Sequence, residues 1–211
     1  MKVVVVAGGP QVVMPVIPPA DHYVGVDHGT MVLLDQGLPV SLAVGDFDSL
    51  SPAEWVRVSQ QVPAIKQSIP EKDDTDVQLA LLEVWQRWQQ AEVTLLGATG
   101  GRLDHFLANL WLPLEPRFQP YLSQLELRDR QNVIRFYLPG NYTVAKVADM
   151  HYLAYCCLTP VTHLTLTGSK YTLTDVAVKV PTSYASNEFL TDTADFSFAS
   201  GLIAVIQSRD A

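Results

Sequence analysis

The sequence predicts an α/β domain followed by an antiparallel β-sandwich domain, and two observations predict it. Up to about residue 127, short apolar runs alternate with stretches of helical periodicity, the pattern of a mainly parallel sheet with helices on both faces. After Asp129, β-rich segments follow one another with only turn residues between them, which is typical of an antiparallel sandwich or roll. We therefore expect one domain over residues 1–130 and a second over residues 131–211.

Each element follows from its own run of residues. In the first domain the predicted strands are Val3–Ala7, Tyr23–Val26, Ser41–Val44, Ala64–Gln67, Val93–Leu96 and Tyr121–Leu127. The predicted helices lie near residues 29–37, 52–61, 74–90 and 103–112. In the second domain the predicted strands are Asn132–Leu138, Tyr142–Val147, His151–Leu158, Val161–Leu166, Tyr171–Val180, Asp195–Phe198 and Leu202–Gln207.

Composition excludes several classes of partner. The formal charge of −8 and the absence of a Lys/Arg-rich run disfavour DNA, RNA and anionic lipid as partners. The opening MKVVVVAGGP has too short an apolar run for a signal peptide or a membrane span, so we expect a cytoplasmic protein. Cys156 and Cys157 are adjacent, which suits buried thiols better than a disulfide or a metal site.

Acidic residues follow the predicted strands of the first domain. Asp27 ends one strand, the GDFDS and KDDTD motifs follow the next two, and Asp104 lies beyond Val93–Leu96. In an open α/β sheet, ligands bind beyond the carboxyl ends of the strands. We therefore expect one cleft to collect these carboxylates.

The GDFDS motif, residues 45–49, has two interpretations. Asp46 and Asp48 can point the same way from an extended turn, and paired carboxylates suit Mg²⁺ with water and phosphate as further ligands. Alternatively, Asp48 or Ser49 caps the following helix, and we expect Ser49 to cap it in either case.

The KDDTD motif, residues 72–76, stands at the start of a strongly amphipathic helix. Its aspartates could serve only as caps and dipole partners. Capping needs a single residue, however, and the surplus carboxylates would repel Asp46 and Asp48 unless a cation relieved them. This favours a metal site.

The GATGGRLDH motif, residues 97–105, joins a strand to a helix. Its glycines allow close approach of a ligand to backbone N–H groups at a helix N-terminus, and Arg102 can bind phosphate oxygens. The motif is neither a Walker A loop nor a GxGxxG fingerprint, and a simple tight turn remains an alternative. Ala7-Gly8-Gly9 is a second candidate phosphate loop on weaker grounds.

Together, these motifs in this order resemble the thiamine pyrophosphokinase family over essentially the whole chain. The resemblance includes the Gly-Gly after the first strand, the segment Val26–Thr30, Asp129–Asn132 and the Ser-Asn-Glu at 186–188. His28 and Thr30 depart from the small residues usual in that segment.

The resemblance implies transfer of a diphosphoryl group from ATP to the hydroxyl of thiamine, giving AMP, by a homodimer with thiamine bound where the subunits meet. It implies Asp46, Asp48 and Asp76 as Mg²⁺ ligands, with Asp74 and Asp104 beside them in the catalytic centre. It also implies nucleotide contacts from Asp27, Thr75, Gly100, Gly101, Arg102 and Asn132, and thiamine contacts from Ser169, Ser186 and Asn187. Asp74, ahead of Asp46, is the expected acceptor of the hydroxyl proton.

Two other functions stay open at this point. Clustered aspartates with Mg²⁺ also activate water, as in a nucleotide phosphohydrolase. The same fold could instead bind a nucleotide or thiamine without turnover, because fold does not fix function.

Overall fold

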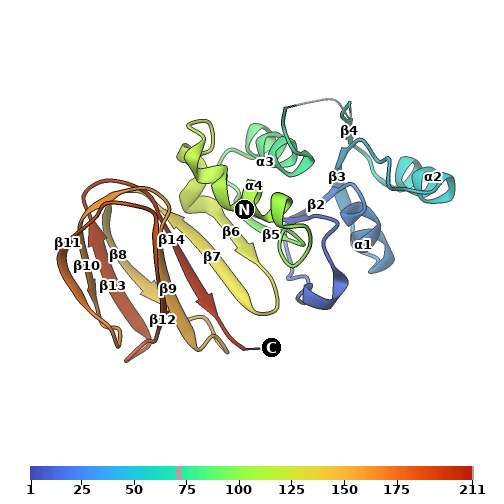
Figure 1. Cartoon of the computed structure of the whole chain (residues 1–211). Helices are drawn as coiled ribbons and strands as arrows, with labels where there is room; N and C mark the ends of the chain where they lie inside the picture. The colour runs from blue at the N-terminus through green and yellow to red at the C-terminus, as the bar shows by residue number, and fades with distance from the viewer. Residues whose placement is uncertain (70–72, 211) are drawn as a thin grey trace. The chain divides into compact units, whose positions relative to one another are not determined.

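The computed structural model describes residues 1–69 and 73–210, which divide into two compact units (Figure 1). The first unit contains Met1–Leu112 and Gln124–Arg130, and the second contains residues 113–123 and the chain from Gln131 onward. The chain passes into the second unit after Arg130. Residues 113–123, which we expected in the first domain, group with the second unit.

The first unit is built on a parallel sheet. Its strands are β1 (Lys2–Val6), β2 (His22–Val26), β3 (Val40–Gly45), β4 (Ile65–Gln67), β5 (Glu92–Leu96) and β6 (Leu125–Arg128). They lie in the order β6-β5-β1-β2-β3-β4, and every neighbouring pair is parallel. Successive connections run outward from β1 to β4, and the chain then returns to the other side of β1. The order therefore reverses at β1, and the space beyond the carboxyl ends of β1 and β5 is the usual place for a ligand.

Four helices accompany this sheet: α1 (Gly29–Asp35), α2 (Pro52–Gln61), α3 (Asp76–Arg87) and α4 (Leu103–Trp111). Figure 1 shows α1 and α3 on opposite sides of β2 and β3. Val4 and Val6 share an apolar cluster with Met31 and Leu34 of α1. Val3 and Val5, which point the other way along β1, are equally buried. Burial on both faces explains why β1 is a continuous run of valines.

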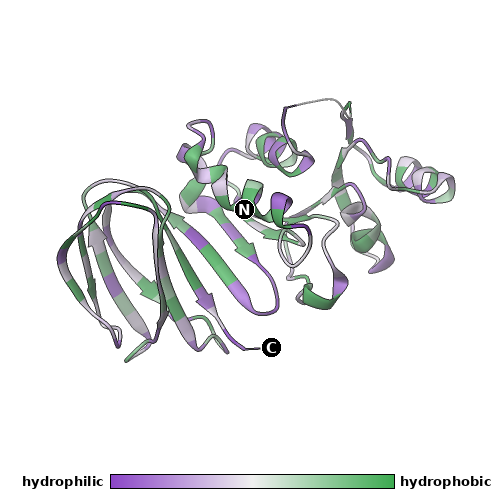
Figure 2. Ribbon diagram, viewed as in Figure 1, coloured by the Kyte–Doolittle hydropathy of each residue, from purple (hydrophilic) through white to green (hydrophobic). Residues whose placement is uncertain are grey.

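The second unit is an antiparallel sandwich. Its strands are β7 (Asn132–Tyr137), β8 (Gly140–Ala145), β9 (Tyr152–Cys157), β10 (Val161–Thr167), β11 (Leu173–Val178), β12 (Thr182–Asn187), β13 (Thr193–Phe198) and β14 (Ile203–Ser208). One layer has the order β12-β9-β14-β7 and the other β11-β10-β13-β8. Tyr155, Phe196 and Val205, from strands of both layers, meet in one core, and Figure 2 shows the alternation of apolar and polar residues along these strands. The predicted fold class is confirmed.

Two strand predictions were wrong. Residues 119–124 form a 3-10 helix, so β6 begins only at Leu125 rather than at Tyr121. Pro120 lacks a backbone N–H and has a fixed φ, which favours a tight turn over a strand. The strand β12 was missed because its sequence, TSYASN, is largely polar and half exposed. Within the described part of the chain, β12 pairs on one side only, with β9.

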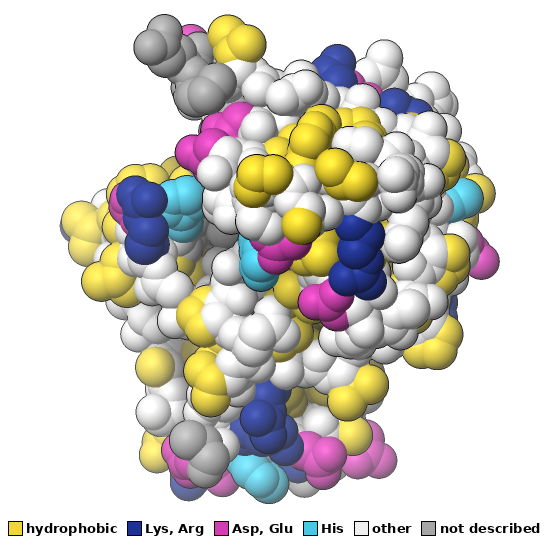
Figure 3. Space-filling view, turned by 90° about the vertical axis from the view of Figure 1, so that its right-hand side faces the viewer, with side chains coloured by type: hydrophobic (Ala, Val, Ile, Leu, Met, Phe, Trp, Pro, Cys, Tyr) yellow, Lys and Arg dark blue, Asp and Glu magenta, His cyan; other side chains and the backbone are white. Residues whose placement is uncertain are grey.

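The surface agrees with the charge pattern of the sequence. On the face drawn in Figure 3, lysine and arginine side chains lie singly or in small groups among acidic and hydrophobic ones. Among the described residues, no helix has both the length and the hydropathy needed to cross a membrane. Cys156 and Cys157 are free thiols, and burial raises the pKa of Cys157 to about 11.

Candidate active site

The predicted acidic and glycine-rich motifs of the first unit all follow strands of its parallel sheet. Asp27 follows β2, Asp46 and Asp48 follow β3, and Gly97 follows β5. Because the strands are parallel, these loops lie along one edge of the sheet. The structure therefore brings the carboxyl-end motifs to the same side of the first unit.

The GDFDS turn is held by two residues in the left-handed region. Asp27 has φ of 47° and Phe47 has φ of 59°, and the Phe47 N–H donates to Asp27 Oδ1 over 3.3 Å. A Cβ at Gly45 would lie 1.8 Å from that same oxygen, so only glycine leaves room for it. Phe47 is buried and packs on Trp55. Burial of Phe47 leaves Asp46 half-buried and Asp48 exposed, with Asp46 Oδ1 accepting the Asp48 N–H over 3.1 Å.

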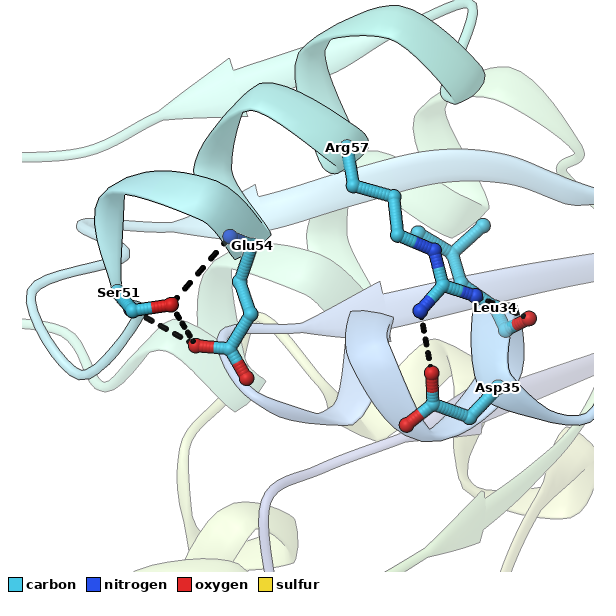
Figure 4. A network of polar contacts seen from close by, with 5 residues as sticks. All are labelled: Leu34, Asp35, Ser51, Glu54 and Arg57. Atoms are coloured by element: carbon cyan, nitrogen blue, oxygen red, sulfur yellow. Dashed lines mark hydrogen bonds and ion pairs between the residues drawn. The ribbon is translucent and has the colours of Figure 1, made fainter.

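The cap of α2 differs from the prediction. Ser51, rather than Ser49 or Asp48, caps the helix in a capping box with Glu54 (Figure 4). Pro52 occupies the first turn. The Ser51 hydroxyl donates to Glu54 Oε2 over 2.7 Å, and this hydrogen bond lowers the pKa of Glu54. In the same view, Arg57 donates to Asp35 and to the Leu34 carbonyl, which ties α2 to the end of α1. Asp46 and Asp48 are therefore not needed as caps.

In the KDDTD motif the threonine, and none of the aspartates, is the cap of α3. Lys72 lies outside the described residues. Thr75 caps α3 in a capping box with Gln78, with the Thr75 N–H donating to Gln78 Oε1 over 2.8 Å. Asp76 Oδ1 accepts the Ser68 hydroxyl over 2.7 Å, which links the start of α3 to the end of β4. Thr75, which we expected to contact the nucleotide, has its hydroxyl engaged with the Gln78 N–H.

The glycine loop after β5 packs tightly against the loop after β1. A Cβ at Gly9 would lie 2.2 Å from the Gly97 carbonyl oxygen, so the two backbones touch. Gly100 has φ of 74°, and a Cβ there would lie 2.6 Å from a methyl group of Val13. The two candidate phosphate loops are thus adjacent at the point where the strand order reverses.

Arg102 and Asp104 form an exposed ion pair at the start of α4. The Arg102 Nη2 donates to Asp104 Oδ2 over 2.6 Å, and both side chains are largely exposed. Their hydrogen bond raises the pKa of Arg102 and lowers that of Asp104. Asp104 also accepts the His105 N–H over 2.9 Å. Arg102 is therefore held beside the loop that it follows.

Three buried polar residues that were not among the predicted site residues support the glycine loop, and of these only Asn109 lies outside the motifs quoted from the sequence. The Thr99 hydroxyl donates to Asp129 Oδ2 over 2.6 Å, and Asn109 Nδ2 donates to the Ala98 carbonyl over 3.0 Å. Thr99, Asn109 and Asp129 are each less than one-tenth exposed. For Asn109, the available sequence signal was a polar residue within the apolar pattern of α4, because a buried polar side chain needs a hydrogen-bond partner.

The predicted thiamine contacts lie in the second unit. Asn187 is 2% exposed and makes four hydrogen bonds: its Nδ2 donates to Ser169 Oγ and the Tyr171 carbonyl, and its Oδ1 accepts from the Tyr171 and Glu188 N–H groups. Ser169 is also buried, whereas Ser186 is exposed at a β-bulge with φ of 59°. Asn132, a predicted nucleotide contact, begins β7 in the same unit. The structure therefore gives Asn187 a clear role in fixing the turn at 169–171.

The donor set of the first unit fits a hard divalent cation. Within residues 1–69 and 73–210, no group of three or more His, Cys, Asp or Glu side chains is close enough to hold a metal. Mg²⁺ does not require such a cage, because it takes one or two carboxylates and completes its shell with water and substrate phosphates. Asp46 and Asp48, neighbours on one turn and both solvent-accessible, supply such oxygens.

Comparison with known proteins agrees with this arrangement. The family model described as "Thiamin pyrophosphokinase, catalytic domain" matches residues 15–122, and "Thiamin pyrophosphokinase, vitamin B1 binding domain" matches residues 141–203. A thiamine pyrophosphokinase of Bacillus subtilis (strain 168) is 36% identical over 215 residues, covering 98% of both chains. A thiamin pyrophosphokinase family protein from Enterococcus faecalis superposes with a TM-score of 0.98 at 57% identity, with 100% of both chains covered. The thiamin pyrophosphokinase from Geobacillus thermodenitrificans gives 0.84 at 37% identity, covering 100% of this chain and 99% of its own. The chain belongs to the thiamin pyrophosphokinase family.

Proposed function

We propose that this protein transfers the diphosphoryl group of ATP to the hydroxyl of thiamine, producing thiamine diphosphate and AMP, with Mg²⁺ as its metal. The observation that carries the proposal is the gathering of carboxylate turns and glycine loops at the carboxyl edge of a parallel sheet whose strand order reverses at β1. Membership of the thiamin pyrophosphokinase family supports the choice of substrates.

The glycine loops are suited to the phosphate chain. Gly100 and Gly101 lie in the turn before α4, where backbone N–H groups and the helix dipole favour an anion. Arg102, already held next to this turn by Asp104, can exchange that partner for a phosphate oxygen. Asp27 and Thr75 shape the neighbouring turns, as their hydrogen bonds to Phe47 and Gln78 indicate.

The carboxylates are suited to the metal. Asp46, Asp48 and Asp76 would hold Mg²⁺, with Asp74 and Asp104 in its vicinity. Bound Mg²⁺ would offset the charge of the polyphosphate and of the departing AMP. The residues themselves then act by orientation: the Asp46 carboxylate is oriented by the hydrogen bond that its Oδ1 accepts from the Asp48 backbone N–H. Asp74 accepts the proton of the attacking hydroxyl, and Asp46 is the alternative acceptor.

The second unit is suited to hold thiamine. Ser186 is exposed beside Asn187, whose hydrogen bonds fix the turn containing Ser169. The chain acts as a cytoplasmic homodimer with thiamine bound where the subunits meet. Analytical ultracentrifugation with and without thiamine tests the dimer, and a monomer of full activity would exclude it.

The deciding experiment follows AMP and thiamine diphosphate together, in purified protein with ATP and Mg²⁺. Transfer requires that both products appear in equal amounts and only when thiamine is present. Release of AMP or ADP without thiamine would instead indicate a nucleotide phosphohydrolase. Binding of ATP or thiamine without any product would indicate a silent binding protein.

A further inference from the structure

Asp129 and Arg130, which directly follow β6, contact the Gly97–Gly101 loop and the segment after β1 in the first unit. Asp129 is 6% exposed and accepts the hydroxyl of Thr99, which is 8% exposed, over 2.6 Å. A short hydrogen bond from a buried hydroxyl to a carboxylate is among the stronger ones in proteins. Asp129 therefore fixes the middle of the Gly97–Gly101 loop.

Arg130 holds the loop that follows β1. Its backbone N–H donates to the Val13 carbonyl over 2.9 Å, and its Nη1 donates to the Val12 carbonyl over 3.3 Å. Val12 and Val13 belong to the 3-10 turn Gln11–Val13, which follows Gly8-Gly9. The same dipeptide thus holds the segment after β1 and the segment after β5.

The two loops also constrain each other directly. Gly9 lies against the Gly97 carbonyl, and Val13 lies against Gly100, both too closely for an added Cβ. A shift of either loop would therefore displace its neighbour. Since the loops occupy the reversal point of the strand order, their shape determines where backbone N–H groups can meet a phosphate chain.

We propose that Asp129 and Arg130 are positioning residues that hold both glycine loops in the conformation that receives the polyphosphate, Asp129 acting through the Thr99 hydroxyl. This inference rests on the proposed function for its substrate, but its geometry stands on contacts in the ligand-free protein. Preorganised N–H donors bind an anion without first losing loop entropy, so the dipeptide should affect nucleotide binding more than thiamine binding.

The test replaces Thr99 by valine, which keeps its shape and removes the hydroxyl, and by serine, which keeps the hydroxyl. Thr94→Val is the matched control, because it makes the same change within β5 away from the loop. For Thr99→Val we expect the KM for ATP to rise about tenfold, with the KM for thiamine within about twofold of wild type. Thr99→Ser and Thr94→Val should match the wild type. A purely structural role of Thr99 would not separate the two KM values.

A second readout needs no activity. Amide hydrogen exchange of Gly100 and Gly101 in the ligand-free protein should be about tenfold faster in Thr99→Val than in wild type or Thr99→Ser. Equal exchange in wild type and Thr99→Val, or equal impairment by valine and serine, would overturn the proposal. If the wild type proves to have no transferase activity, the proposed function fails, but this comparison still decides the positioning role.

If Thr99→Val does not fold, Asp129→Asn takes its place. The amide keeps an oxygen acceptor for Thr99 and loses the charge, so we expect exchange of Gly100 and Gly101 to be about threefold faster. Exchange at the wild-type rate in this variant would also overturn the proposal.

Discussion

The Asp27 carboxylate accepts the backbone N–H of Phe47 across the ends of two neighbouring strands, and both residues have positive φ. Two non-glycine residues in the left-handed region, each costing about 1 kcal/mol or more, persist only where the surroundings hold them. Here the space left by Gly45 and the burial of Phe47 do so. The consequence is a turn that presents Asp46 and Asp48 without help from a helix cap.

Two substitutions of Asp27 distinguish the contribution of its hydrogen bond to stability from that of its charge. Asp27→Asn keeps an oxygen that can accept the Phe47 N–H, so we expect the ligand-free stability to change by less than about 1 kcal/mol. Asp27→Ala removes the acceptor, and we expect a loss of about 2 kcal/mol in chemical denaturation. Equal stability of the two variants would contradict a holding role for this carboxylate.

Asp46 is predicted to be essential for turnover but not for folding. In Asp46→Asn we expect kcat to fall by at least about a hundredfold, because a neutral amide is a poor ligand for a hard cation. The circular dichroism spectrum should stay unchanged, and Glu92→Gln, at the opposite end of β5, serves as control. Retained activity in Asp46→Asn would exclude Asp46 as a metal ligand.

The capping box of α2 should make stability depend on pH. Ser51→Ala removes the cap, and we expect the thermal midpoint to fall by about 3 °C at neutral pH. The pKa of Glu54 is lowered by its hydrogen bond with Ser51, so its contribution is present above the unfolded-state pKa and is lost as the pH falls through the folded-state pKa. Differential scanning calorimetry should therefore show the gap between wild type and Ser51→Ala narrowing in acid. A gap that widens in acid would be inconsistent with this capping box.

Asn187 should be a stability residue of the second unit. Asn187→Ala removes the acceptor of the Tyr171 and Glu188 N–H groups, and we expect a loss of about 3 kcal/mol in the free energy of unfolding. Unfolding should be followed by Tyr and Trp fluorescence together, because the two units need not unfold as one. Ser186→Ala, at the exposed neighbouring position, is the control and should leave stability within about 0.5 kcal/mol. If the two variants unfold alike, the hydrogen bonds of Asn187 do not stabilise the unit.

Tyr155 carries a buried hydroxyl in the sandwich core. Its oxygen is without a hydrogen-bond partner among the described residues, and burial raises the pKa of Tyr155 to about 12. A raised pKa means that the contribution of the neutral phenol is complete below the unfolded-state pKa of about 10 and is lost as the pH rises through 12. At pH 7, the free energy of unfolding of Tyr155→Phe should therefore equal or exceed that of the wild type. In alkali the wild type should lose stability relative to the variant, by up to about 1.4 kcal/mol per pH unit. Wild type and variant losing stability in parallel in alkaline denaturation would contradict this.

Some features were predictable because they depend on local patterns. A continuous run of valines, as in β1, indicates a strand that is covered on both faces. Alternating polar and apolar residues, as after Asp129, indicate a strand of a sandwich. Both types of strand were assigned correctly. The positions of the acidic motifs at strand ends followed from the same periodicity. Their predicted roles in catalysis stay predictions.

Other features depend on contacts that periodicity does not encode. The cap of α2, by contrast, was readable: Ser51-Pro52-Ala53-Glu54 has the spacing of a capping box with Pro at the first helical position, which favours Ser51 over Ser49. The pairing of Thr99 with Asp129 joins residues 30 positions apart, and it exists only because β5 and β6 are neighbours. β12 was hidden because half-exposed Ser and Thr carry little hydrophobic signal.

Between Leu112 and Gln124, the chain of the first unit is interrupted by residues that belong to the second unit. This interruption constrains the order in which the parts of a newly synthesised chain can fold. A ribosome releases β1 to β5 and α4 first, yet the strand β6, and with it Asp129, emerges only after a segment that belongs to the other unit. Before Asp129 has emerged, the Thr99 hydroxyl of the Gly97–Gly101 loop has no carboxylate to bind. A fragment ending at Leu112 would therefore have the catalytic motifs but not a fixed glycine loop, and expression of the catalytic half should extend through Arg130.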